Sequence, residues 1–375
     1  MEADHTNSGG YERDVRISTC GLEWTSPVKQ GPQSGSASSS GLKSLSEYKA
    51  PVFVVGSARS GTTLLYHTLL SSGAFAVYLT GPVVFDLLVP RFGDLSKLKN
   101  RSRLLPVWFQ SYQYRLSGLD RNSIENKILT ECHSNGDFLR IVMNEIALHQ
   151  GVERWAVSDP DNLLHIPAIA CDIRNALFLH MIRDGRDVAL SMNREGWIRP
   201  FPWDRKRSLL VAALHWKWKV ERGRRFGRQI MHRYLEIHFE DLVSRPTSTL
   251  GDIGRFIGHD LDYEQIQRAS IGTLRKPNST FRGADGTLTS SPVGRWKTHL
   301  TKSDIVQIES VIGPLLEDLG YPLEFPAAHT RDVSVKLMKT LYPPFFDFKE
   351  WLKAKTPLGR LVSTKRLRFN DEVPK

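Results

Sequence analysis

The sequence predicts an α/β fold in which a P-loop-like parallel sheet is flanked by helices. Short apolar runs at 51–56, 176–182 and 234–238 have the length and composition of buried parallel strands. Segments with helical character alternate with them, at 62–70, 184–192, 209–225 and 247–257. Because this alternation is typical of parallel sheets covered on both faces, we expect that architecture here.

A mostly helical insertion is expected over the ligand end of this sheet. Residues 80–150 combine helical patterns with basic loops. Since open parallel sheets bind ligands outside the carboxyl ends of their strands, an insertion at this end can form a pocket. Residues 1–48 are rich in Ser, Gly and charge, which predicts a disordered tail. The expected organisation is therefore a tail at 1–48, a folded domain at 49–325 and a basic, aromatic extension at 326–375.

Composition predicts a soluble, cytoplasmic protein that encounters anions. The chain has 51 Lys and Arg against 40 Asp and Glu, a formal charge of +11. This balance suits a nucleotide, a nucleic acid or a membrane surface, or reflects a basic surface in general. The spacing of Cys20, Cys132 and Cys171 indicates neither a disulfide framework nor a metal site. No apolar run approaches the ~18 residues of a membrane span, and the N-terminus lacks the apolar segment of a signal peptide.

The strongest local signal is the loop Gly-Ser-Ala-Arg-Ser-Gly-Thr-Thr at 56–63, between a predicted strand and a predicted helix. Such a loop points several backbone N–H groups at one spot, and the helix N-terminus adds partial positive charge, so it suits a phosphate or sulfate. The alternative is a tight turn in which a serine caps the helix. The candidate anion ligands are Ser57, Arg59, Ser60, Gly61, Thr62 and Thr63.

This loop departs from the ATP-binding P-loop. The pattern G-x-x-x-x-G-K-[ST] keeps its two glycines here, but Thr62 stands where the Lys is required. Kinases and ATPases use that Lys amine, with a nearby Mg²⁺, on the β- and γ-phosphates. The departure therefore indicates chemistry other than that of ordinary ATP enzymes.

A second anion-binding pattern follows the strand predicted at 176–182. Arg183 stands at its end, and Ser191 lies eight residues further on. Because eight residues make about two helical turns, both side chains can converge on one phosphate, with Arg183 as a bidentate ligand. The alternative is a surface Arg–Asp pair that opens a helix.

Together these segments resemble the sulfotransferases that use 3′-phosphoadenosine-5′-phosphosulfate (PAPS), in particular their soluble bacterial-type branch. Residues 54–65 resemble the family's 5′-phosphosulfate loop, and R-D-G-R-D-V-A-L-S at 183–191 its 3′-phosphate motif. Similarities at 236–246, 294–301 and 318–322 extend the resemblance over roughly 50–323. It implies transfer of a sulfuryl group from PAPS to a hydroxyl or amine acceptor without a metal. It also implies that 49–325 is the sulfotransferase domain.

The resemblance implies roles for individual residues. Arg59 and its loop would hold the 5′-phosphosulfate, and Arg183 and Ser191 the 3′-phosphate. The segment at 294–301, Gly-Arg-Trp-Lys-Thr-His-Leu-Thr, is similar to the family's G-x-W-K element, which lies beside a loop that helps to hold the same phosphate. Arg282 and Lys297 are the contributors that this similarity suggests.

The base that removes the acceptor's proton is harder to find, because the sequence departs here from the family pattern. Relatives tend to carry a Glu where this chain has a Gly-Pro pair, and the next acid is Asp86, which is the candidate base. An Asp there is also a routine solvent-facing helix residue. Helix capping by Asp159 and core packing of His165 are the structural alternatives to catalysis by those two residues. The weaker candidates are Asp159, His165 and His299.

Two further questions stay open at the level of sequence. A phosphotransferase, or a nucleotide-binding module without catalysis, could use the same loop. The segment at 337–362 mixes aromatic residues with several Lys, which fits either a peripheral membrane contact or an apolar flap packed on the domain's own surface. The expected partners are PAPS and an unidentified acceptor, and no nucleic acid.

Overall fold

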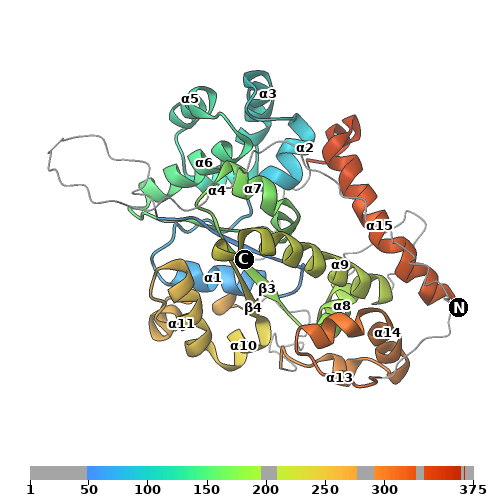
Figure 1. Ribbon diagram of the computed structural model, residues 1–375. Helices are drawn as coiled ribbons and strands as arrows, with labels where there is room; N and C mark the ends of the chain where they lie inside the picture. Colours follow the sequence, from blue (N-terminus) through green and yellow to red (C-terminus); the bar gives the residue numbers. More distant parts are fainter. Residues whose placement is uncertain (1–48, 196–208, 277–290, 327–332, 365–366, 368–375) are drawn as a thin grey trace, which may run out of the picture. The chain divides into compact units, whose positions relative to one another are not determined.

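A four-stranded parallel sheet forms the centre of the computed structural model, which describes residues 49–195, 209–276, 291–326, 333–364 and 367 (Figure 1). Three predicted strands are confirmed, as β1 (Val52–Gly56), β3 (Leu177–Ile182) and β4 (Tyr234–His238). The sequence pattern misses the edge strand β2 (Ala156–Ser158), because three residues are too few to show a strand periodicity. The strand order is β2-β1-β3-β4. The expected tail at 1–48 lies outside the described residues.

The sheet separates two apolar cores. Successive side chains of a strand point to opposite faces, so β1 sends Phe53 and Val55 to one side and Val52 and Val54 to the other. Because all four are fully buried, the run is continuously apolar, as expected for a parallel strand between two layers. The predicted α/β architecture is thus confirmed.

The helices outside the insertion surround the sheet, and four of them agree closely with the four predicted segments. On the Val52 side, α1 (Thr62–Ser71), α10 (Phe239–Ser244), α11 (Pro246–Ile257) and α12 (Tyr263–Ala269) contribute to the core. A third apolar cluster joins the end of β3 to three further helices. These are α8 (Gly185–Glu195), α9 (Leu209–Gly227) and α14 (Lys302–Asp318).

The insertion is mostly helical, as predicted, and its helices gather on the side of Phe53 (Figure 1). Its N-caps follow sequence rules, since Ser111, Asp120 and Ser134 each accept a backbone N–H of the helix that they precede. The elements are η1 (Val84–Leu88, a π-helical turn), α2 (Val89–Phe92), α3 (Leu98–Phe109), α4 (Tyr112–Ser117), α5 (Arg121–Glu131) and α6 (Asn135–His149). Between β2 and β3 follow η2 (Pro160–His165) and α7 (Ile166–Asp172).

The C-terminal extension forms a long helix, α15 (Val333–Lys355), and a short 3₁₀ turn, η5 (Pro357–Leu361). One face of α15 packs against α9, where Val335 and Phe346 are buried in apolar clusters. Packing on the domain's own surface is therefore confirmed for this face. Within the described ranges, no helix combines the length and apolar character needed to cross a membrane.

Candidate functional site

The two predicted anion-binding segments meet at the carboxyl ends of β1 and β3. The strands are parallel neighbours, with Gly56 opposite Met181. In the sheet, β2 pairs with the outer edge of β1, and β4 pairs with the outer edge of β3, so the chain leaves β1 and β3 in opposite directions. Such a divergence opens the crevice in which open α/β sheets bind ligands. The topology therefore brings the loop after β1 next to Arg183.

The loop after β1 has a constrained backbone. Arg59 and Gly61 adopt left-handed conformations, with φ of 68° and 97°. A non-glycine residue in that region is uncommon, and such residues concentrate at functional sites. A Cβ at Gly61 would lie 2.4 Å from the ring of Phe239, so only glycine fits. Phe239 thus holds the loop from the end of β4.

The start of α1 is left open by this loop. Gly61 is its N-cap residue, and no side chain caps the helix, so the capping role considered for Ser60 is wrong. The hydroxyls of Ser57 and Ser60 are buried and make no hydrogen bond to any described residue. A buried polar group without a partner costs about 1–3 kcal/mol, so these hydroxyls fit a bound anion. Thr62 is buried beside them, while Thr63 is exposed.

Arg59, Arg183 and Ser191 lie together, and Arg59 links the two motifs. Arg59 Nε donates to Ser191 Oγ at 3.0 Å, and Arg183 Nη1 donates to the Arg59 carbonyl at 3.1 Å. Arg183 also stacks on the Phe239 ring, and its Nε has no hydrogen-bond partner among the described residues. Burial lowers the pKa of Arg59, and the charge of Arg183 lowers it further, against the Glu195 carboxylate 3.6 Å away. Two arginines thus share one partly buried space.

Arg295 is the cation that the sequence analysis missed. Burial, followed by the positive charges of Arg183, Arg194 and Arg59, lowers its pKa to about 10, although Asp187 raises it. Cations that depress each other's pKa are stabilised when an anion binds between them. The only signal in the sequence was its place inside the G-x-W-K element, which drew attention to Lys297 instead.

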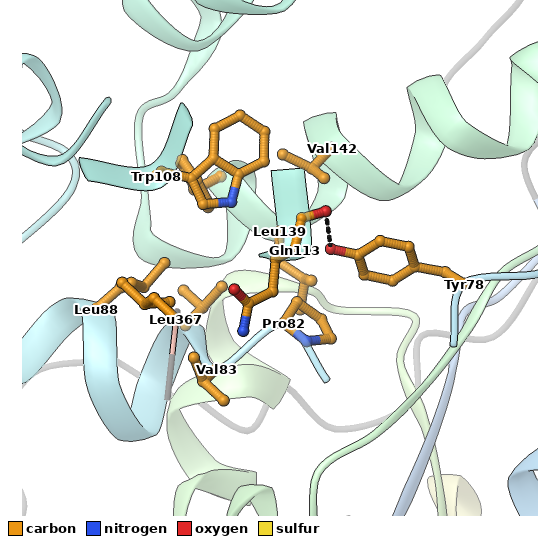
Figure 2. A pocket seen from close by; sticks show the side chains of 11 residues that line it. Tyr78, Pro82, Val83, Leu88, Trp108, Gln113, Leu139, Val142 and Leu367 are labelled. Atoms are coloured by element: carbon orange, nitrogen blue, oxygen red, sulfur yellow. Dashed lines mark hydrogen bonds between the residues drawn. The ribbon is translucent and has the colours of Figure 1, made fainter. Parts of the chain in front are cut away.

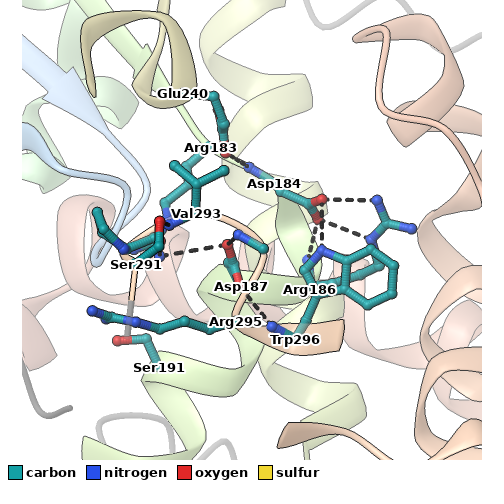
Figure 3. A network of polar contacts seen from close by, with 12 residues as sticks. Arg183, Asp184, Arg186, Asp187, Ser191, Glu240, Ser291, Val293, Arg295 and Trp296 are labelled. Atoms are coloured by element: carbon teal, nitrogen blue, oxygen red, sulfur yellow. Dashed lines mark hydrogen bonds and ion pairs between the residues drawn. The ribbon is translucent and has the colours of Figure 1, made fainter. Parts of the chain in front are cut away.

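Asp187 fixes the backbone around Arg295. Its carboxylate accepts the N–H groups of Gly294 and Trp296 at 2.8 and 2.9 Å (Figure 3). It also lies 3.6 Å from Arg183 Nη2. Helix α8 therefore positions a loop more than one hundred residues away in the sequence.

Asp184 and Arg186 belong to a buried ion-pair network beside this site. Arg186 is buried and pairs with Asp184 at 2.8 Å and with Glu309 of α14 at 2.6 Å. Its guanidinium lies 3.8 Å from the centroid of the Trp296 ring, and the Trp296 indole N–H donates to Asp184 (Figure 3). The five-residue motif at 183–187 thus has two functions, since Arg183 faces the loop after β1 and Arg186 faces the interior.

Of the two other predicted ligands, one lies within the described residues. Lys297, on the short helix α13 (Trp296–His299), is exposed, and its Nζ lies 5.5 Å from the Trp296 ring. Arg282 lies outside the described residues.

Asp86, the predicted base, is buried in η1 rather than facing solvent. Its carboxylate binds Lys353 Nζ of α15 and lies 3.7 Å from His165 Nε2. Although burial lowers the pKa of Lys353, the Asp86 and Glu350 carboxylates raise it overall. Within the described chain, His165 Nε2 makes no hydrogen bond, and the ring stacks on Phe85.

Lys353 thus places a positive charge beside the Asp86 carboxyl, next to an imidazole, an arrangement that suits proton transfer. The other two candidates have structural partners. Asp159 caps η2 by accepting the N–H of Asp161, and the His299 ring contacts the carbonyl of Arg295.

The comparison with protein families agrees with this geometry. The model of the sulfotransferase family matches residues 51–265, more than half of the 375-residue chain. The chain belongs to the sulfotransferase family. The match includes the loop after β1, Arg183, Asp86 and His165, and it ends before Arg295 and α15. The predicted resemblance is therefore confirmed at the level of the family.

Solved sulfotransferase structures are similar to this chain at low sequence identity. The sulfotransferase domain of the Synechococcus PCC 7002 olefin synthase is 19% identical, over 74% of this chain and 98% of that one, with a TM-score of 0.48. The sulfotransferase domain from the curacin biosynthetic pathway is 15% identical, over 73% and 98%, with a TM-score of 0.48. A mouse sulfotransferase complexed with PAP is 16% identical, over 72% and 88%, with a TM-score of 0.40.

A small apolar cavity lies within the insertion of this sulfotransferase (Figure 2). Tyr78 closes one side and donates its hydroxyl to the Gln113 carbonyl at 2.9 Å. Leu367, at the C-terminal end of the described chain, is buried in the same lining. The remaining lining residues are Pro82, Val83, Val84, Leu88, Trp108, Phe138, Leu139 and Val142.

The described residues of this sulfotransferase contain no group of three or more His, Cys, Asp or Glu side chains that could hold a metal ion. Arg59, Arg183 and Arg295, by contrast, interact electrostatically beside Ser57 and Ser60, whose buried hydroxyls have no hydrogen-bond partner among the described residues. Chemically, this arrangement is suited to a ligand with more than one anionic group.

Proposed function

We propose that this sulfotransferase transfers a sulfuryl group from PAPS to a hydroxyl or amine on an acceptor. The observation that carries the proposal is the convergence of Arg59, Arg183 and Arg295 on a loop whose serine hydroxyls are buried without partners among the described residues. PAPS is a polyanion with a phosphate at its 3′ position and a phosphosulfate at its 5′ position. Two anionic groups of one ligand match two cationic segments at one crevice.

Each segment fits one end of the donor. Ser57, Ser60, Thr62, Thr63 and the open N–H groups of α1 would hold the 5′-phosphosulfate. Arg183 and Ser191 would hold the 3′-phosphate, and Arg295 adds a charge that Asp187 keeps in place. Lys297 and Arg282 remain proposed contributors. The domain that performs the reaction would be 49–325, with 326–375 as an extension.

Arg59 would act in the transfer step. PAPS, when bound, supplies a sulfuryl group on a phosphate leaving group. The acceptor oxygen or nitrogen forms a bond to sulfur as the bond from sulfur to the bridging oxygen breaks. Arg59 stabilises the negative charge that accumulates on that oxygen, which leaves with the product PAP. When PAPS binds, the hydrogen bond that Arg59 now makes to Ser191 would be replaced by a contact to the donor.

Asp86 and His165 would take the acceptor's proton. Asp86 is fixed by Lys353, so its carboxylate can orient His165 and stabilise the ring once it is protonated.

Calorimetric titration of the full chain with PAP in the absence of metal tests the donor site. Wild-type protein should bind PAP, and Arg183→Ala should weaken binding by roughly 1.5–3 kcal/mol, because a bidentate contact to the 3′-phosphate is lost. Arg255→Ala is the matched control, since this arginine lies on the surface and pairs with Asp252.

Equal affinity of wild type for PAP and for adenosine 5′-phosphate would contradict the roles of Arg183 and Ser191. Binding of ATP with Mg²⁺ in preference to PAP would favour a phosphotransferase. Transfer is tested by incubating the protein with PAPS and pooled candidate acceptors and looking for a gain of SO₃ by mass spectrometry. PAP binding without any such gain would favour a nucleotide-binding module without catalysis.

A further inference from the structure

The outer face of α15 exposes a row of large apolar side chains. Each has more than half of its surface accessible, from 52% at Leu341 to 76% at Val333. A domain surface normally exposes such side chains singly, so a row of them on one helix needs an explanation. The row consists of Val333, Leu337, Leu341, Phe348 and Trp351, and Leu358 and Leu361 of η5 are exposed just beyond it.

Helical geometry places the five α15 residues in a single stripe. Their spacings of four, four, seven and three residues keep them within an arc of about 80°, at 3.6 residues per turn. The opposite face carries Val335 and Phe346, which are buried against α9. Helix α15 packs against α9, α2 and α14 (Figure 1), while the side chains of the stripe are exposed and point away from this packed side. The helix is therefore apolar on two faces, although only one of them is packed.

Aromatic residues and cations give the stripe a particular character. The Phe348 and Trp351 rings stack, with centroids 6.1 Å apart, and both are 54% exposed. Trp and Phe beside Lys are typical of helices that lie in a membrane interface. The segment exposes Lys336, Lys339, Lys349, Lys355 and Arg360. By the same geometry Lys355 lies within the arc of the stripe and Lys336 about 60° from its edge, whereas Lys339 and Lys349 lie toward the packed side.

The acidic residues of α15 do not offset these cations on the outer face. Asp347 accepts the Trp218 indole N–H and pairs with Arg222 of α9. Glu350 lies 3.7 Å from Lys353, whose ammonium binds Asp86. Both carboxylates are therefore engaged with groups of the folded domain, and they do not offset the charges of Lys355 and Lys336 on and beside the apolar stripe.

We propose that the outer face of α15 binds the surface of an anionic lipid bilayer. The apolar stripe would enter the boundary between headgroups and acyl chains, while the exposed Lys side chains contact anionic headgroups. An apolar protein partner would need no such rim of cations, and a second copy of this chain would place the same positive charges against one another. The proposal does not depend on the proposed catalytic function.

Co-sedimentation of the full-length protein with vesicles tests this proposal. Wild type should bind phosphatidylcholine vesicles that contain phosphatidylserine more strongly than vesicles of phosphatidylcholine alone, and added salt should weaken the binding. Phe348→Ala with Trp351→Ala should lower the partition coefficient about tenfold or more, because the apolar area that enters the bilayer is lost. Lys336→Gln with Lys355→Gln should remove most of the preference for phosphatidylserine.

Met231→Ala is the matched control, since Met231 is 69% exposed but lies away from α15, and it should bind vesicles as wild type does. Circular dichroism and thermal unfolding would establish that each variant is folded. Absence of vesicle binding by folded wild type would overturn the proposal, as would equal binding by the Phe348/Trp351 variant. A dimer that this double variant dissociates, without vesicle binding, would assign the face to a second copy instead.

Discussion

At the scale of single residues, Arg59 combines two unusual properties. It adopts a left-handed backbone conformation, and its side chain is directed to Ser191 on a different element. Strained residues persist where the surrounding structure enforces them, and Phe239 enforces this loop by packing against Gly61. We therefore assign Arg59 to the transfer step rather than to binding alone.

Arg59→Ala is expected to lower kcat by about 10²-fold or more while the affinity for PAP changes much less. Arg59→Lys should retain part of the rate, because an ammonium can still approach the bridging oxygen although the planar fork is lost. Steady-state turnover and calorimetry with PAP measure the two effects. A variant that loses affinity but keeps its saturated rate would show that Arg59 is a binding residue.

Asp86 and Lys353 allow the proposed proton transfer to be tested through its pH dependence. Asp86→Asn should lower kcat by about 10²-fold. Lys353→Met removes a cation that favours the carboxylate form, so the pKa of the Asp86 carboxyl should rise. The acidic limb of the kcat profile should then move to higher pH. A Lys353→Met profile that is lower but not displaced would indicate a purely structural role.

At the scale of elements, Arg186 connects α8, α14 and the loop that carries Arg295. Its guanidinium pairs with Asp184 and Glu309 and stacks on Trp296. Removing one member of a buried ion network leaves the other charges uncompensated, which is strongly destabilising. The motif at 183–187 therefore joins ligand binding to the stability of its surroundings.

Arg186→Met is expected to lower the free energy of unfolding by about 3–5 kcal/mol, because two buried carboxylates lose their partner. Urea denaturation followed by circular dichroism measures the change. Arg183→Ala is the control from the same motif and should alter PAP affinity with a much smaller loss of stability. Equal destabilisation by the two substitutions would contradict the assignment of Arg183 to ligand binding and Arg186 to stability.

At the scale of the whole molecule, one buried and one half-buried histidine link the stability of the fold to pH. His180 lies within β3, and His215 lies between Trp218 of α9 and Phe346 of α15. Burial, as the largest cause, lowers the pKa of each ring from 6.5 to about 3. For His215, Lys219 and Lys349 lower it further and Asp161 raises it.

Because the folded-state pKa lies below that of the unfolded chain, the neutral rings contribute fully to stability above about pH 6.5, and this contribution is lost as the pH falls towards 3. At about pH 5, each ring should lower the free energy of unfolding by roughly 2 kcal/mol relative to neutral pH. His215→Phe should therefore show a shallower fall in the free energy of unfolding between about pH 6.5 and 5. His232→Phe, at an exposed position, is the control and should follow wild type. Parallel wild-type and His215→Phe curves would contradict the prediction.

The sequence by itself determined the α/β class, three of the four strands and the two anion-binding motifs. These features are local, because strand length, helix periodicity and loop composition appear within about ten to fifteen residues of chain. The family followed from the same motifs, since the loop after β1 and the segment after β3 carry its most specific residues. The sequence did not predict β2, because a strand of three residues is too short to show a periodicity.

Only the tertiary structure decided which charges meet. Arg295 is positioned near Arg183 and Arg59 because Asp187 binds the backbone on either side of it, and Asp86 is held by Lys353, 267 residues away. The sequence showed that α15 is aromatic and basic, but not which face would pack on α9. Partners of buried charges and the faces of helices depend on contacts between segments far apart in the chain. Local periodicity carries no information on those contacts, so the folded arrangement alone defines them.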